Sequence, residues 1–264
     1  MKQVLIAFLV ICLPSFALAS ERKVVSLTSI NYPPYFSEDL PYGGVMTDLI
    51  RAALKHSGMR LRVDFLDFPK ALELAQFSSN HDGIYSVWYN QARAKWAYYS
   101  DPIIPNAMGF YRHRDSELSA YWNMTYLEAS SKKIGVVSGY LNPIEVEQSN
   151  LEKLIVESDL QNLNALIKGK ADLILIDKMV AESLIKVNYP QQENEFIWLD
   201  PPLEYKMQYL AIAKDAPFAK EKIDAFNQGL KYIKQHGMYQ KIMKNHGFDW
   251  LLKDQTNWLH HIAQ

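Results

Sequence analysis

Cysteine is nearly absent from this 264-residue chain, whose single example, Cys12, lies close to the N-terminus. One cysteine excludes a disulfide within the chain, and it excludes a zinc site built from several thiolates. The seven histidines show no HExxH motif and no comparable ligand spacing. We therefore expect neither a metal nor a cofactor.

An excess of either charge is also lacking. The chain has 28 lysines and arginines against 29 aspartates and glutamates, a formal net charge of −1. No stripe of basic residues rises above this neutral background, so a nucleic-acid partner is not expected. The sequence contains no G-x-S-x-G elbow and no P-loop, which removes two common enzymatic signatures.

Long apolar runs are restricted to the N-terminus. Lys2 precedes an apolar run over residues 4–13, and Ala17-Leu18-Ala19 supplies an A-x-A site. This pattern predicts a secretory signal peptide over residues 1–19, cleaved after Ala19. The run is shorter than the ~20 residues that cross a bilayer, so a retained anchor is the weaker alternative.

Strand-like and helix-like segments alternate along the rest of the chain. The first half predicts strands over residues 23–27 and 60–66, and helices over residues 46–56 and from Pro69 onward. The second half predicts strands over residues 133–137, 171–176 and 208–213, and helices over residues 160–168, 179–186 and 219–236. This β-α-β order predicts an α/β fold with mostly parallel sheets flanked by helices.

The stretch over residues 82–102 (DGIYSVWYNQARAKWAYYSDP) is the most informative one. A β-prone run ends at a polar turn, and Arg93 follows at the opening of a short helix among aromatic residues. A guanidinium in this setting can hold a carboxylate through two hydrogen bonds while the rings exclude water. The alternative is a solvated arginine whose stem lies on Trp96.

Asp177 is a lone acid at the end of the continuously apolar run ADLILI. Such a run is typical of a strand buried on both faces, so Asp177 should lie at the carboxyl edge of a sheet, where open α/β folds bind ligands. The alternative is an N-cap for the helix that follows, a common use of aspartate.

Four segments in order carry a resemblance to a known family. They are GVMTDLIRA (residues 44–52), RAKWAYYSDP (93–102), GKADLILID (169–177) and LKYIKQHGMYQKI (230–242). Together they resemble the motifs of the family-3 solute-binding proteins, the periplasmic receptors for polar amino acids in ABC import. The resemblance covers roughly residues 22–248.

The resemblance implies a type II periplasmic-binding-protein fold, in which two α/β lobes, each a mostly parallel sheet flanked by helices, are joined by two hinge strands. Residues 20–105 and 208–248 would form lobe 1, residues 106–207 lobe 2 with the hinges, and residues 249–264 a C-terminal tail. A ligand in the cleft would contact both lobes and drive their closure.

The resemblance also implies roles for individual residues. Arg93 falls on the family's clamp for a ligand carboxylate, and Asp177 on the acceptor of the ligand's ammonium. Tyr32 and Phe68 fall on aromatic walls of the site, although both could equally be core residues of lobe 1. Ser29 falls on a polar contact.

Several positions depart from the family pattern. Trp88 and Ser86 stand where members often carry threonine and glycine. The second-lobe motif, which includes the predicted contacts Ser138 and Tyr140, ends in tyrosine instead of threonine. We therefore expect a more aromatic pocket than that of a glutamine receptor.

The function implied by the resemblance is capture of a small amino acid or related carboxylate in the periplasm. The protein would act as a monomer and deliver its ligand to an inner-membrane ABC permease. Two alternatives stay open: an enzyme on the same fold, similar to the cyclohexadienyl dehydratases, and a periplasmic ligand sensor.

Overall fold

The computed structural model describes residues 23–119, 122–140, 142–254 and 258. The predicted signal peptide, its cleavage site after Ala19 and Cys12 lie outside these residues. Within the described part of the chain, none of the helices combines the length and the apolar character that a membrane span requires.

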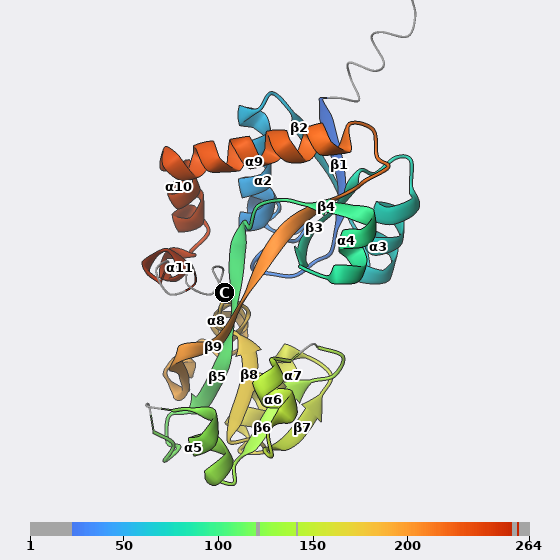
Figure 1. Cartoon of the computed structure of the whole chain (residues 1–264). Coiled ribbons are helices and arrows are strands. Elements are labelled where there is room, and N and C mark those ends of the chain that lie inside the picture. The colour runs from blue at the N-terminus through green and yellow to red at the C-terminus, as the bar shows by residue number, and fades with distance from the viewer. Residues whose placement is uncertain (1–22, 120–121, 141, 255–257, 259–264) are drawn as a thin grey trace, which may run out of the picture.

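The chain folds into two α/β lobes, one above the other in Figure 1. Lobe 1 contains a parallel sheet of β1 (Val24–Ser29), β2 (Arg60–Phe65) and β3 (Gly83–Trp88), with the short strand β4 (Ala97–Tyr99). Its helices are α2 (Val45–His56), α3 (Phe68–Phe77), α4 (Gln91–Trp96), α9 (Ala219–Gln235) and α10 (Met238–Asn245), with a 3₁₀ turn at Pro41–Gly43.

Lobe 2 repeats this plan on a smaller scale. Its parallel strands are β6 (Lys133–Val137), β7 (Glu152–Val156) and β8 (Leu173–Asp177). Its helices are α5 (Met124–Ala129), α6 (Ile144–Gln148), α7 (Asp159–Ile167) and α8 (Lys178–Asn188), with a 3₁₀ turn at Glu193–Glu195. All of β8 is buried, as its continuous apolar run predicts.

Two long strands join the lobes. β5 (Ile104–His113) and β9 (Phe196–Ala213) pair with each other in antiparallel fashion, and each continues into a neighbouring lobe sheet. The resulting strand order is β2-β1-β3-β9-β5-β8-β6-β7, with β4 beside β9. The predicted α/β fold with two lobes, mostly parallel sheets and two hinge strands is therefore confirmed.

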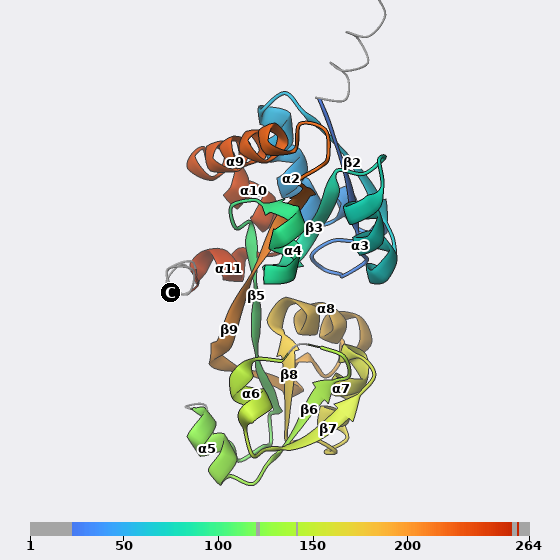
Figure 2. The ribbon, with the colours of Figure 1, turned by 45° about the vertical axis from the view of Figure 1, so that its right-hand side comes forward.

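Helix α8 faces lobe 1 although it belongs to lobe 2, as Figure 2 shows. Met179 and Val180, in its first turn, pack into the hydrophobic core of lobe 1. The lobes are thus in contact through buried side chains beside the hinge, and α8 supplies part of that contact.

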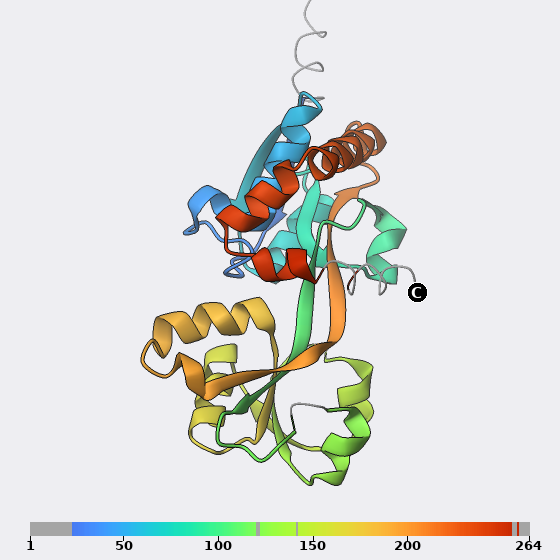
Figure 3. The same cartoon turned by 90° about the vertical axis from the view of Figure 1, so that its left-hand side faces the viewer.

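The start of the C-terminal tail packs against the same junction. Helix α11 (Asp249–Lys253) lies beside the hinge strands in Figures 1 and 3. Its Leu251 is buried, and its Trp250 ring lies on one side of the Lys178 ammonium, 4.9 Å from Nζ to the ring centroid. The ring of Trp198, on β9, lies 4.7 Å from the same ammonium. These tail residues therefore contact lobe 2 at the start of α8, on the side that faces lobe 1.

Gly229 should be essential for packing α9 on α2. A Cβ added to Gly229 would lie 2.0 Å from the main-chain oxygen of Ala53. We expect Gly229→Ala to lower the free energy of unfolding by about 1–3 kcal/mol, because the helices must move apart. Chemical denaturation measures this, with the exposed α9 substitution Gln228→Ala as control. Equal stability of both variants would contradict the packing argument.

Candidate functional site

A cavity of about 470 Å³ lies between the two lobes. The carboxyl ends of strands from both lobes meet there, the usual position of ligand sites in open α/β sheets. Its volume lies within the range of small-molecule pockets. The lining residues are Ile30, Tyr32, Phe36, Phe68, Ser86, Val87, Trp88, Tyr89, Asn90, Arg93, Asn106, Met108, Gly139, Tyr140, Asp177 and Gln208.

Arg93 is positioned by the short helix that follows β3. Asn90 caps α4 by accepting a hydrogen bond from the Arg93 main-chain nitrogen at 3.0 Å. The guanidinium Nη1 donates to the Trp88 carbonyl at 3.0 Å and to the Tyr99 hydroxyl at 3.1 Å. The Nε atom of Arg93 is buried without a hydrogen-bond partner. Local contacts through Nη1 thus fix the side chain, and the buried Nε donor remains without a partner.

Asp177 lies at the end of β8, with a side chain that is 2% exposed. Its carboxylate accepts hydrogen bonds from the main-chain nitrogen atoms of Val180 at 2.9 Å and Ala107 at 3.1 Å. It also accepts from Asn106 Nδ2 at 3.1 Å and from the Tyr35 hydroxyl at 2.9 Å. The N-cap expected as an alternative is present. The same carboxylate also joins lobe 2 to the hinge and to lobe 1.

Burial dominates the electrostatics of Asp177. It raises the pKa of the carboxyl from 3.8 to about 6, although the hydrogen bonds that the carboxylate accepts act in the opposite direction. Burial also raises the pKa of the Tyr32 hydroxyl, and the negative charge of Asp177 adds to that shift.

Aromatic side chains from both lobes form much of the cavity wall. Phe68, at the start of α3, is 45% exposed, and Tyr140, after β6, is 43% exposed. The hydroxyl of Tyr140 donates to Asp159 Oδ2 at 2.9 Å. The indole nitrogen of Trp88 donates to Asn106 Oδ1 at 2.8 Å, and Lys206 Nζ lies 4.7 Å from the Trp88 ring centroid.

The structure brings six of the eight predicted site residues to this cavity: Arg93, Asp177, Tyr32, Phe68, Trp88 and Tyr140. Ser29 is fully buried at the end of β1 and does not line it. Ser138 is exposed, is not among the lining residues, and donates its main-chain N–H to the Val156 carbonyl at 2.8 Å.

Sequence reasoning missed several polar groups that line the cavity, among them Asn106, Gln208 and Ser86. Gln208, on hinge strand β9, is 2% exposed, and neither its side-chain nitrogen nor its oxygen has a hydrogen-bond partner. Ser86 sits at an irregularity of β3 with φ 60°, and its buried hydroxyl also has no partner. The one available signal for Gln208 was a polar residue at the start of an otherwise apolar strand.

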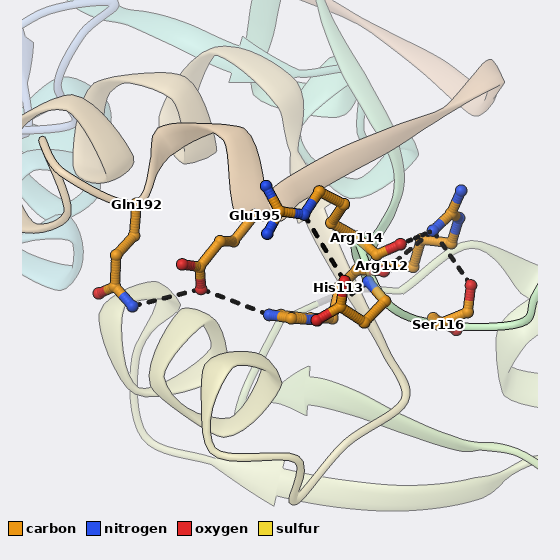
Figure 4. Close-up of polar contacts among 7 residues, drawn as sticks. Arg112, His113, Arg114, Ser116, Gln192 and Glu195 are labelled. Atoms are coloured by element: carbon orange, nitrogen blue, oxygen red, sulfur yellow. Dashed lines mark hydrogen bonds and ion pairs between the residues drawn. The ribbon is translucent and has the colours of Figure 1, made fainter.

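The basic residues after the first crossover to lobe 2 serve the local structure. Arg112 Nη1 donates to the main-chain oxygen atoms of His113 at 2.9 Å, Arg114 at 3.1 Å and Ser116 at 3.3 Å (Figure 4). His113 contacts Glu195 at 3.4 Å. In the described part of the chain, no group of three or more metal-ligating side chains is assembled.

The Asp177 carboxyl should leave a signature in the pH dependence of stability. Its native pKa, about 6, lies above the value of 3.8 for an unfolded chain, so the native state holds the proton more tightly. Its contribution to the free energy of unfolding therefore falls as pH rises from about 4 to about 6. Relative to Asp177→Asn, wild type should lose about 2–3 kcal/mol over this range.

Chemical denaturation of both proteins at several pH values measures this difference. The substitution Asp39→Asn, at an exposed carboxyl, is the control. Parallel profiles for wild type and Asp177→Asn would contradict the assigned shift.

Comparison with solved structures yields proteins of the same architecture. The second substrate-binding domain of Lactococcus lactis GlnP, in its open conformation, is 21% identical with a TM-score of 0.67, covering 85% of this chain and 95% of that one. An ancestral cationic amino acid solute-binding protein is 18% identical with a TM-score of 0.68, covering 87% and 98%. These structural similarities show that the chain has the type II periplasmic binding fold.

The chain is also structurally similar to a histidine kinase sensor domain that resembles periplasmic binding proteins. That match has 17% identity and a TM-score of 0.64, and it covers 85% of this chain and 96% of that one. A search of curated protein sequences finds no match. The family description "Bacterial extracellular solute-binding proteins, family 3" matches residues 24–249. Since this match spans both lobes and both hinge strands, the chain belongs to the family-3 bacterial extracellular solute-binding proteins.

Proposed function

We propose that this protein is exported to the periplasm, where as a monomer it captures a small amino acid or related carboxylate and presents it to an inner-membrane ABC permease. The observation that carries the proposal is Arg93. Its guanidinium is fixed by Trp88 and Tyr99, retains an unpaired Nε, and faces an aromatic-lined cavity between two hinged lobes.

The ligand carboxylate would bind the Arg93 guanidinium on lobe 1. A charge-assisted hydrogen bond of this kind is stronger than a neutral one, and the aromatic surroundings exclude competing water. The body of the ligand would lie among Tyr32, Phe68, Trp88 and Tyr140. Because these rings come from both lobes, a ligand that touches all of them stabilises the closed arrangement over the open one.

The solved relatives support a receptor over the other classes. Two of them are named for substrate or cationic amino acid binding, whereas one is a histidine kinase sensor domain. A sensor role would require a signalling partner for the closed state, and the cavity by itself fits either use. We favour import because substrate-binding proteins and domains recur among the structures with this fold.

An enzyme similar to the cyclohexadienyl dehydratases would need a group able to donate or accept a proton in the cavity. Asp177 is the carboxylate that lines it, but four donors already hold that group in place. Moving a proton there would break a buried network at the lobe junction. We therefore propose binding without turnover.

Arg93→Ala should abolish ligand-induced stabilisation. A thermal-shift screen of amino acids and small carboxylates on wild type identifies binders. For each binder we expect Arg93→Ala to weaken binding by about 2–5 kcal/mol, because a charged, partly buried partner is lost. Arg60→Ala, at an exposed position at the start of β2, is the matched control. Tight binding by Arg93→Ala would refute the assigned clamp.

Incubation with prephenate or arogenate should leave both compounds unchanged. Product absorbance follows the reaction directly, and we expect a rate equal to that of buffer alone. Turnover that disappears in Asp177→Asn would instead establish the enzymatic alternative.

A further inference from the structure

The carboxylate that faces the cavity has no free position for a cationic group. Asp177 Oδ2 accepts from Tyr35, Asn106 and Ala107, and Oδ1 accepts from Val180 and from the same tyrosine hydroxyl at 3.1 Å. An ionised carboxylate offers about four lone-pair sites, and four donors occupy them. A ligand ammonium could reach Asp177 only by displacing one of these donors.

These donors are themselves part of the lobe junction. Tyr35 comes from lobe 1, is fully buried, and packs its ring on Phe248 with the centroids 5.1 Å apart. Asn106, on hinge strand β5, accepts from the indole of Trp88 through Oδ1 while it donates to Asp177 through Nδ2. Every member of this network is satisfied within the protein, so it joins the lobes without a ligand.

Among the described residues that line the cavity, the buried polar atoms that lack partners belong to lobe 1 and the hinge. They are Arg93 Nε, the hydroxyl of Ser86 and both side-chain polar atoms of Gln208. The Gln208 amide can donate and accept, and the Ser86 hydroxyl can do both as well. These three side chains suit a carboxylate that carries an adjacent neutral oxygen function. They offer one cation and no anion.

The second acid in the neighbourhood does not change this balance. Asp159 does not line the cavity, and it accepts a hydrogen bond from the Tyr140 hydroxyl. Among the described residues that line the cavity, Arg93 and Asp177 carry the charges, and Asp177 is already saturated. A zwitterion would thus bring its ammonium into a largely aromatic space whose free acceptors, Gln208 Oε1 and the Ser86 hydroxyl, are neutral. Burying that positive charge without an anion to pair with it costs free energy.

We propose that the ligand is a hydrophobic carboxylate with a neutral hydroxyl in place of the ammonium of an amino acid, held by Arg93, Gln208 and Ser86 while Asp177 fastens the lobes. This inference rests on the proposed function, since it assumes that Arg93 binds a carboxylate in this cavity. It narrows the ligand class from amino acids and carboxylates to hydroxy acids.

The test compares matched pairs of ligands on the intact mature protein by isothermal titration calorimetry. The pairs are lactate and alanine, hydroxyisocaproate and leucine, phenyllactate and phenylalanine, and indolelactate and tryptophan. We expect the hydroxy acid of the best-binding pair to bind about tenfold or more tightly than its amino acid, the size of effect that an unsatisfied buried polar group produces.

Tyr35→Phe tests the reason for this preference. The substitution keeps the ring and removes the donor that Asp177 shares between its two oxygens, so one acceptor position becomes free. We expect the preference for the hydroxy acid to shrink by roughly tenfold, because an ammonium can then take the vacated position. Tyr85→Phe is the matched control, since Tyr85 is equally buried but its hydroxyl bonds Thr47 at 2.7 Å.

The outcomes separate this inference from the proposed function. Tighter binding of the amino acid in each pair, or of a quaternary-ammonium carboxylate such as glycine betaine, overturns the inference while Arg93-dependent binding preserves the receptor. A hydroxy-acid preference that Tyr35→Phe leaves unchanged overturns the assigned role of Asp177. Binding that Arg93→Ala does not weaken overturns both proposals.

Discussion

The buried carboxylate of Asp177 accepts hydrogen bonds from lobe 1, from the hinge and from its own lobe. Taking a charge out of water is costly, and the cost is offset only when donors surround it. Here the donors come from a lobe 1 loop, a hinge strand and the first turn of α8, so the charge is stable only when all three segments are in register. The geometry of the cavity follows from that condition.

The two lobes contribute different kinds of group to the cavity wall. Lobe 1 and the hinge supply the unpaired polar atoms, whereas lobe 2 contributes mainly surface, through Tyr140, Gly139 and Met108 near its end of β5. A ligand would therefore be oriented by lobe 1 and covered by lobe 2. This order agrees with hinge closure, in which one lobe binds first and the other completes the contact.

Local sequence patterns were sufficient to predict strands β1, β2, β3, β6 and β8, the end of β9 and most helices, but not β4, β5 or β7. They also predicted two residues that line the cavity. Arg93 could be predicted from the sequence because a cation in an aromatic segment beside a polar turn is unusual. Asp177 could be predicted because an apolar run ends on it. The contact between Tyr35 and Asp177 joins residues 142 apart in sequence. No periodicity or motif encodes such a pairing, since it arises only when two lobes meet.

Gln208 and Asn106 were missed for a related reason. Both lie on hinge strands, where one face of the strand borders the cavity, and a single polar residue there reads as ordinary strand composition. The packing of α11 could not be predicted either, because a helix of five residues is too short to show an amphipathic pattern that would indicate what it packs against. What the sequence could not supply was the relation between distant segments.

The indole rings of this protein are distributed in a way that makes its motion observable. The Trp198 and Trp250 rings both contact the Lys178 ammonium, at 4.7 Å and 4.9 Å, with their own centroids 6.5 Å apart. Trp88 borders the cavity and contacts Lys206. Indole emission depends on nearby charge and on access of water to the ring. A rotation of one lobe against the other would change both the charge near these rings and the access of water to them. Intrinsic tryptophan fluorescence should therefore report lobe opening without an attached dye.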